Sequence, residues 1–305
     1  MYDIIIIGGG PAGYSAALYS SRAKFDTLVI EKMFTGGQMA TTDIIENYPG
    51  FEEPIGGSDL ALRMEKQARK FGTVVLNDEI LALDLDSKIK VVKTQKNTYE
   101  CKALILCMGA YPKMLGLDKE EAFRGAGVSY CAVCDGAFYK NKTVAVVGGG
   151  DTAVEDALYL ARFCPKIYLI HRRDSLRATK IMQDELFCNR KIELVWDSVV
   201  EEIIGQHGVE GLKLKNLKTN VSSQIDVDGL FIAIGLNPNI SLINGKVQQS
   251  KEGYIITDER MRTNIPGVFA AGDIRQKFLR QVITAASDGA TASYSAELYI
   301  TETKW

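Results

Sequence analysis

The chain has 305 residues, of which 46% are hydrophobic and 24% charged, so it is long enough for two globular domains of ordinary size. Its formal net charge of −2 excludes the strong positive field typical of proteins that bind nucleic acid or an anionic membrane surface. The N-terminal apolar run, residues 4–7, is too short for a signal peptide or a membrane span, which predicts a cytoplasmic protein.

The first predicted elements form a βαβ unit: a strand over residues 3–7, a glycine turn, a helix over residues 14–23 and a strand over residues 27–31. Such a turn binds a pyrophosphate through backbone N–H groups at the helix N-terminus. The predicted contacts are Gly8, Gly10, Pro11, Ala12 and Gly13. Glu31 ends the second strand, where a carboxylate accepts hydrogen bonds from a ribose diol and repels a 2′-phosphate. This site therefore predicts FAD or NAD.

Further along the chain, residues 58–71 are typical of an amphipathic helix, with Ser58 as the expected N-cap. Residues 88–100 and 213–227 alternate polar and apolar side chains, which predicts antiparallel strands. Short buried strands are predicted at residues 104–107, 230–234 and 268–271.

Cys131 and Cys134 form a C-x-x-C motif, a spacing used for metal binding or for redox chemistry. A metal site needs two more ligands, and the sequence has no second motif of this kind and no histidine pair, which favours a redox disulfide. Asp135 is the candidate proton carrier, with a structural role in the following turn as the alternative. The other cysteines, Cys101, Cys107, Cys164 and Cys188, are expected to be buried.

A second βαβ unit follows, with a strand over residues 143–147, a glycine turn, a helix over residues 154–163 and a strand over residues 167–170. Its predicted dinucleotide contacts are Gly148, Gly150, Asp151 and Thr152. Instead of an acidic residue, the second strand ends in His171, Arg172, Arg173 and Arg177. Guanidinium groups bind a phosphate dianion in bidentate fashion, so this site predicts NADPH, although a solvated basic turn is the alternative. His171 is interpreted as part of the pocket and not as a catalytic base.

Proline-containing joints at Tyr111-Pro112 and Asn237-Pro238 mark the expected crossings between two domains. We therefore expect an α/β protein with two Rossmann-like, three-layer nucleotide-binding domains, one inserted into the other. The first, discontinuous domain comprises residues 1–112 and 241–305 and binds FAD. The inserted domain, residues 113–240, binds NADPH and carries the cysteine pair.

Six motifs in this order resemble those of the bacterial-type, low-molecular-weight thioredoxin reductases and cover essentially the whole chain. They are residues 8–13, 36–38, 131–136, 148–153, 171–177 and 272–273. The resemblance implies FAD in the first domain, with Glu31, Gly37, Gln38 and Asn47 beside the cofactor. It also implies that the segment with Gly272, Asp273, Arg280, Gln281 and Val282 closes over the ribityl chain and flavin. It further implies a homodimer, with thioredoxin or a thioredoxin-like protein as the partner.

Three positions depart from the family pattern. Met108 stands where a threonine is common, Val133 replaces a frequent threonine between the cysteines, and Ala137 precedes Phe138 where some relatives have two phenylalanines. The last departure affects the expected docking surface for thioredoxin and not the chemistry.

The implied reaction passes electrons from NADPH to FAD, then to the Cys131–Cys134 disulfide, and then to the partner by thiol–disulfide exchange. Because the cysteines and the nicotinamide site share one domain while the flavin belongs to the other, we expect the inserted domain to rotate about crossings near residues 111–115 and 237–242. A flavoprotein that takes electrons from ferredoxin is disfavoured by the arginine cluster, and one that passes electrons to ferredoxin is disfavoured by the cysteine pair. The flavoprotein of an alkyl hydroperoxide reductase is disfavoured because it needs an extra N-terminal region with a disulfide, whereas this sequence starts at the predicted FAD strand. A non-catalytic redox sensor leaves the C-x-x-C-Asp motif unexplained.

Overall fold

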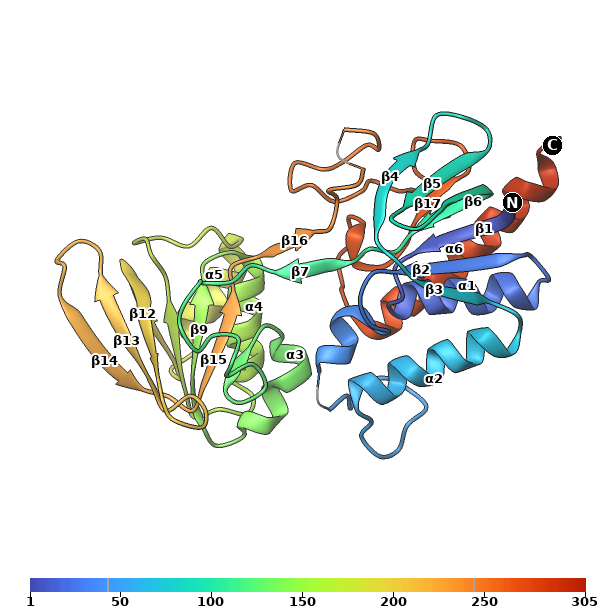
Figure 1. The fold of residues 1–305 in the computed structure, drawn as a ribbon. Helices are drawn as coiled ribbons and strands as arrows, with labels where there is room; N and C mark the ends of the chain where they lie inside the picture. Colours follow the sequence, from blue (N-terminus) through green and yellow to red (C-terminus); the bar gives the residue numbers. More distant parts are fainter. Residues whose placement is uncertain (43, 244) are drawn as a thin grey trace. The chain divides into compact units, whose positions relative to one another are not determined.

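The computed structural model describes residues 1–42, 44–243 and 245–305. The chain divides into two compact units, one comprising Met1–Tyr111 with Asn237–Trp305 and the other Pro112–Leu236 (Figure 1). We call them unit 1 and unit 2.

Unit 1 is built on one seven-stranded sheet. Its strands are β1 (Tyr2–Ile7), β2 (Thr27–Glu31), β3 (Val74–Asn77), β4 (Ile80–Asp84), β5 (Lys90–Thr94), β6 (Thr98–Leu106) and β17 (Val268–Ala270). The order β3-β2-β1-β6 is parallel throughout, and β17 is parallel to the end of β6. The start of β6 pairs antiparallel with β5, and β5 with β4. The parallel part therefore has the predicted nucleotide-binding topology.

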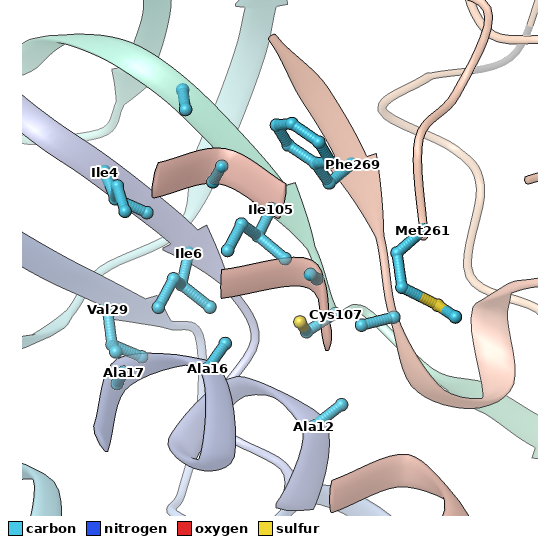
Figure 2. Close-up of a cluster of buried hydrophobic side chains, with 14 of the residues drawn as sticks. Ile4, Ile6, Ala12, Ala16, Ala17, Val29, Ile105, Cys107, Met261 and Phe269 are labelled. Carbon is cyan, nitrogen blue, oxygen red and sulfur yellow. The ribbon is translucent and has the colours of Figure 1, made fainter. Parts of the chain in front are cut away.

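Among its described residues, unit 1 has three helices: α1 (Pro11–Arg22), α2 (Gly57–Lys70) and α6 (Val282–Glu302). Two short 3₁₀ turns, η1 (Gly37–Thr41) and η3 (Gly272–Ile274), complete it. Figure 2 shows the core between α1 and the sheet, where Ile4, Ile6 and Ile105 lie near Ala16 and Ala17 of the helix. The small alanine side chains let α1 pack closely on the sheet, and this packing fixes the position of its N-terminus.

Helix α6 packs directly on α1, and a buried hydrogen bond of 2.7 Å joins Ser20 Oγ to Ser293 Oγ. At Gly289 the two helices approach so closely that a Cβ atom would lie 2.0 Å from the carbonyl oxygen of Ala12. Both helices begin near the carboxyl ends of the parallel strands, where the first glycine turn lies, so this contact sets the geometry of that turn.

Gly289→Ala is therefore expected to lower the free energy of unfolding by about 1–3 kcal/mol, because the added methyl group would overlap the carbonyl oxygen of Ala12, which is part of the backbone of α1. Alanine is otherwise the better helix former, so an unchanged or raised stability would contradict the close contact. Urea unfolding measures the change. The matched control is Ser287→Ala in the same helix, an exposed position where we expect a change within about 0.5 kcal/mol.

Unit 2 contains a five-stranded parallel sheet of order β11-β10-β9-β15-β8 and a three-stranded antiparallel sheet. The parallel strands are β8 (Val128–Ser129), β9 (Thr143–Gly148), β10 (Lys166–Ile170), β11 (Ile192–Val195) and β15 (Gly229–Ala233). The antiparallel ones are β12 (Ser198–Ile204), β13 (Gly211–Asn216) and β14 (Ser222–Asp226). Helices α3 (Ala132–Asp135), α4 (Asp151–Leu160) and α5 (Lys180–Cys188) and the turn η2 (Gly136–Tyr139) belong to this unit.

The chain passes between the units twice, at β7 (Ala110–Pro112) and at β16 (Leu236–Pro238), and these two strands pair with each other. Each is flanked by a glycine in the left-handed region, Gly109 with φ of 68° and Gly235 with φ of 107°. Glycine adopts such angles without strain.

The two βαβ units and the antiparallel strands are confirmed, as are the short buried strands expected at 230–234 and 268–271, with ends that shift by a few residues, whereas residues 104–107 belong to the longer strand β6. Two expectations are wrong. The residue before α2 is Gly56, and no side chain caps this helix, so Ser58 is not the N-cap. Cys188 is exposed at the end of α5, whereas Cys101, Cys107 and Cys164 are buried as expected. Within the described part of the chain, no helix is long and apolar enough to cross a membrane.

Candidate active site

The first glycine turn lies at the carboxyl end of β1. Gly8 has φ of 105°, and a Cβ atom there would lie 2.4 Å from the carbonyl oxygen of Cys107. Gly10 is the N-cap of α1, and Pro11 occupies the first helical turn, where its missing N–H costs nothing. A Cβ at Gly10 would meet only the Gly36 oxygen, at 3.9 Å, so the backbone is open to a ligand on this side.

Glu31 lies directly beside this turn. Its Oε2 accepts a hydrogen bond from the backbone N–H of Gly9 at 2.6 Å, and its Oε1 accepts one from Met33 N–H at 3.0 Å. The carboxylate at the end of β2 is thus held against the glycine turn, in the position from which such residues bind a ribose.

A hydrogen-bond network that the sequence did not predict supports the first glycine turn. The buried Tyr14 hydroxyl lies 3.0 Å from Thr35 Oγ1 and donates to Glu65 Oε2 at 3.3 Å. Burial raises the pKa of Tyr14 to about 12, so the phenol stays protonated. A Cβ at Gly9 would lie 2.9 Å from the Tyr14 hydroxyl. Glu65 and Thr35 also hydrogen-bond to each other, which ties α2 to the loop before Gly36.

The C-terminal site residues gather around η3 and the start of α6. Asn47 Nδ2 donates to Gln281 Oε1 at 3.1 Å, which joins two predicted site residues 234 positions apart. The guanidinium of Arg280 lies 4.2 Å over the ring of Tyr254. Among the described residues, two buried atoms lack a hydrogen-bond partner here, Asp273 Oδ1 and Arg280 Nε. Burial raises the pKa of the Asp273 carboxyl.

Asp288, which no motif indicated, organises this segment. Its buried carboxylate accepts the Gly272 N–H at 3.0 Å and pairs with Lys277 at 2.7 Å and Arg275 at 3.3 Å. The acceptor fixes the turn that carries Asp273, and the negative charge balances two half-buried cations.

We expect Asp288→Asn to lower the free energy of unfolding by about 2 kcal/mol, because an amide keeps the contact to Gly272 and leaves Lys277 and Arg275 without their counter-charge. The measurement is urea unfolding together with the flavin content of the purified protein. Adding Lys277→Met should restore part of the loss, and a double variant less stable than Asp288→Asn would contradict the charge argument.

The residues of this edge fit an adenine dinucleotide with a flavin. The glycines at the N-terminus of α1 leave the backbone N–H groups accessible to a ligand, and Glu31 lies at the ribose position. The Asp273 oxygen that lacks a hydrogen-bond partner needs a donor, such as a ribityl hydroxyl. Gly37, with φ of 54°, approaches Gly10 closely, so that a Cβ there would lie 3.8 Å from the Gly10 Cα. Gln38 follows in η1, and Val282 is the first residue of α6.

In unit 2 the cysteine pair forms a disulfide across the single turn of α3, with the two Cα atoms 5.3 Å apart. Both cysteines are half-buried, and Cys131 is the N-cap of α3, where its Sγ accepts the Cys134 N–H at 3.2 Å. Asp135 is half-buried at the end of the same turn, and its Oδ2 accepts a hydrogen bond of 2.6 Å from Ser129 Oγ. The carboxyl group and the disulfide therefore share one short helix.

Two further side chains near α3 were not predicted. Burial, with a smaller contribution from the charge of Asp135, raises the pKa of Tyr139, in η2, to about 12. On α4, which packs against α3, burial raises the pKa of Asp156 to about 7. Asp156 lies three residues after the buried Ala153 and four before the buried Leu160, and this helical spacing signals an inward-facing position.

The second glycine turn follows β9. A Cβ at Gly148 would lie 2.5 Å from the carbonyl oxygen of Ala233, and one at Gly149 would lie 2.2 Å from the His171 ring. Gly150 is the N-cap of α4, and a Cβ there would meet nothing within 4 Å. The turn is thus tightly packed on the protein side and open at Gly150, as a pyrophosphate site requires.

The structure brings the arginine segment to this turn, because Arg177 N–H donates to the Gly149 oxygen at 2.6 Å. The side chains of Arg172, Arg173 and Arg177 are exposed, and in the part of the chain that the structure describes none of them forms an ion pair. Burial lowers the pKa of His171, with a smaller contribution from the neighbouring arginine charges. These guanidiniums fit a 2′-phosphate. Asp151 accepts the Thr179 N–H at 2.7 Å, and Thr152 is exposed beside it.

Comparison with known proteins agrees with this arrangement. The family model described as pyridine nucleotide-disulphide oxidoreductase matches residues 2–289. The chain is similar to thioredoxin reductase from Peptoclostridium acidaminophilum, with 48% identity over 98% of this chain and 97% of the relative. Among solved structures, thioredoxin reductase from Streptococcus pyogenes matches with a TM-score of 0.93, 44% identity and 99% coverage of both chains. Lactococcus lactis thioredoxin reductase in the FR conformation matches with a TM-score of 0.70 and 42% identity, over 99% of this chain and 100% of that one.

The chain carries two glycine turns with different residues at the end of the following strand, Glu31 in one and His171 with the arginines in the other, and one C-x-x-C disulfide. The family to which it is similar uses FAD and NADPH. The chain belongs to the pyridine nucleotide-disulphide oxidoreductases and, within them, to the thioredoxin reductases.

Proposed function

We propose that this protein reduces the disulfide of thioredoxin or a thioredoxin-like protein with electrons from NADPH. The observation that carries the proposal is the Cys131–Cys134 disulfide in α3, half-buried and followed directly by a carboxyl group, within a chain similar to thioredoxin reductases. FAD, when bound, supplies a two-electron relay between NADPH and this disulfide.

We propose that unit 1 holds the FAD. Gly8, Gly10 and the start of α1 bind its pyrophosphate, and Glu31 binds its adenosine ribose. The remaining contacts come from Pro11, Ala12, Gly13, Gly37, Gln38, Asn47, Gly272, Asp273, Arg280, Gln281 and Val282. Support comes from the packing of the turn and from the orphaned Asp273 oxygen.

We propose that unit 2 holds the NADPH. Gly148, Gly150, Asp151 and Thr152 face its pyrophosphate. Arg172, Arg173 and Arg177 bind the 2′-phosphate, and His171 packs behind the turn. The support is that Arg177 N–H donates to the Gly149 oxygen and that the three arginines are exposed, with no carboxylate paired to them in the described residues.

The disulfide takes up two electrons and one proton to give one thiol and one thiolate, while the Asp135 carboxylate takes up a second proton. A thiolate then attacks the partner disulfide, and the other enzyme thiol closes the Cys131–Cys134 bond again. The thiol proton and the Asp135 proton leave with the two partner thiols, so charge and electrons balance. Val133 and Phe138, both 43% exposed, are apolar side chains beside this turn that we assign to docking, together with the smaller Ala137.

Unit 2 is proposed to rotate relative to unit 1 between the half-reactions. The paired crossings β7 and β16, each flanked by a glycine in the left-handed region, support this role as a hinge. A covalent cross-link between one engineered cysteine in each unit tests it. We expect steady-state turnover to fall while one half-reaction continues, and unchanged turnover would contradict the rotation.

We also propose that the protein acts in the cytoplasm as a homodimer, on the ground of its family. Sedimentation of the holoenzyme tests the oligomeric state, where a single species with the mass of one chain, 33.5 kDa, would contradict the dimer. The proposed reaction itself is tested by NADPH oxidation that depends on oxidised thioredoxin.

A further inference from the structure

The buried hydroxyl of Ser129 connects the carboxyl group of Asp135 with the backbone of the redox pair. Ser129 lies in β8, where it pairs with Phe231 of β15, and only 3% of its surface is exposed. Its Oγ donates to Asp135 Oδ2 at 2.6 Å and accepts the Cys131 N–H at 3.1 Å. The hydroxyl is therefore fixed by the sheet and touches both ends of the turn that holds the disulfide.

A second acceptor lies within reach of the same proton. The Cys131 carbonyl oxygen is 3.4 Å from Ser129 Oγ, longer than the 2.6 Å contact to Asp135. A hydroxyl group has one proton to donate and can accept at the same time. While Asp135 is a carboxylate, the short contact takes this proton. Once Asp135 is protonated, its own O–H can donate to Ser129, whose proton then turns to the Cys131 carbonyl.

We infer that Ser129 is a positioning residue for the redox reaction, whose hydroxyl holds the Asp135 carboxyl group beside Cys131 in both of its protonation states. The inference rests on the proposed function, in which Asp135 stores the proton that leaves with the partner thiol. It adds to that function a residue in β8, outside the C-x-x-C-Asp motif.

The bond to the carboxylate is the stronger of the two arrangements, since hydrogen bonds to a charged acceptor are roughly twice as strong as neutral ones. Ser129 therefore favours the charged form of Asp135. Removing the hydroxyl favours the protonated form of Asp135. The carboxyl group then keeps its proton, and can still supply it, up to a higher pH.

Other titratable groups surround this turn and have to be separated from Asp135. Tyr139 in η2 stays protonated because burial raises its pKa to about 12. Before Cys131, the Tyr130 hydroxyl donates to Glu120 at 2.8 Å, and the Arg124 guanidinium lies over the Tyr130 ring. The titratable side chains of α4 are Asp151, Glu155, Asp156 and Tyr159. Of these, Asp156 is the main rival, because burial raises its pKa to about 7.

The test is the pH profile of thioredoxin reduction by the holoenzyme with Ser129→Ala. We expect the midpoint of the alkaline limb to move up by roughly half to one pH unit, with kcat several-fold lower, and Ser129→Thr to restore the wild-type profile. Ser198→Ala is the matched control, because this buried serine donates to a backbone oxygen in the same unit, and it should leave the midpoint unchanged.

A double-mutant cycle assigns the effect. In an Asp135→Asn background, Ser129→Ala should no longer move the midpoint, whereas in an Asp156→Asn background the shift should persist. A Ser129→Ala profile that coincides with wild type, a shift that survives Asp135→Asn, or an alkaline limb that disappears in Asp156→Asn would each overturn the inference.

An independent readout does not require turnover. In a Cys188→Ser background, which removes the exposed free cysteine, the reduced enzyme is alkylated with iodoacetamide over a range of pH, and Cys131 and Cys134 are followed by mass spectrometry. A protonated Asp135 repels a thiolate less, so the alkylation midpoint should fall in Ser129→Ala and not in Ser198→Ala. If wild type failed to reduce thioredoxin, the proposed function would be wrong, and an unchanged alkylation profile would overturn the role of Ser129 separately.

Discussion

Replacing Cys134 by serine should lower thioredoxin reduction by about a thousandfold or more, because the disulfide that passes electrons to the partner can no longer form. The flavin site belongs to the other unit of the chain by our proposal, so the variant should purify yellow with an unchanged flavin content. The measurements are NADPH oxidation in the presence of oxidised thioredoxin and the flavin absorbance of the purified protein.

Cys188→Ser is the matched control, because Cys188 is an exposed free thiol in the same unit as the disulfide. It should keep full activity. Full activity in Cys134→Ser would show that electrons leave the protein by another route, and loss of flavin from that variant would show that the disulfide is needed for the fold of unit 1.

The second large effect is expected at the arginine cluster. Changing Arg172, Arg173 and Arg177 together to glutamine should lower kcat/KM for NADPH relative to that for NADH by about a thousandfold or more, because each of the three lost charged hydrogen bonds to the phosphate contributes about 1.5–3 kcal/mol. NADH carries no 2′-phosphate, so its own kcat/KM should change little. Steady-state kinetics with both coenzymes give the ratio.

Arg190→Gln is the control for the loss of one surface positive charge, since Arg190 is exposed in unit 2 and lies outside the predicted cluster. Its coenzyme ratio should stay that of wild type. A proportional loss with NADPH and NADH in the triple variant would contradict a 2′-phosphate site and indicate general damage to the turn.

The sequence was sufficient where the signal is local. A buried strand, a glycine turn and a helix lie within about a dozen residues of each other, and the strand Thr27–Glu31 begins and ends as expected. The helix starts were less well predicted. Helices α1 and α4 begin at Pro11 and Asp151, inside the glycine motifs, whereas the sequence predicted that each helix begins three residues later.

The expectation for Ser58 failed because a tertiary contact sets the start of α2. The Gly57 N–H donates to the Thr42 oxygen at 3.0 Å, and a Cβ at Gly57 would lie 2.0 Å from the Met39 oxygen. The chain therefore turns into the helix where the backbone packs, before Ser58 is reached. Cys188 was misjudged because the end of α5 faces outward, as its exposed neighbour Phe187 also shows.

The site residues that the sequence did not indicate act through partners far along the chain. Glu65 reaches Tyr14 across 51 positions, and Asp288 reaches Gly272 across 16. Ser129 lies only six residues before Asp135, yet its role depends on β8 joining the sheet, and a two-residue strand leaves no periodic pattern. Such pairings follow from tertiary packing and not from local composition.

The central claim is that electrons pass from NADPH through the Cys131–Cys134 disulfide to thioredoxin. It is tested most directly by mixing the wild-type holoenzyme and the Cys134→Ser holoenzyme with NADPH, each with and without oxidised thioredoxin, and counting thioredoxin thiols formed per NADPH oxidised. Two thiols per NADPH with wild type, and none above background with Cys134→Ser, is the predicted result. Thioredoxin thiols formed at the wild-type rate by Cys134→Ser, or NADPH oxidation by wild type that ignores thioredoxin, would contradict it.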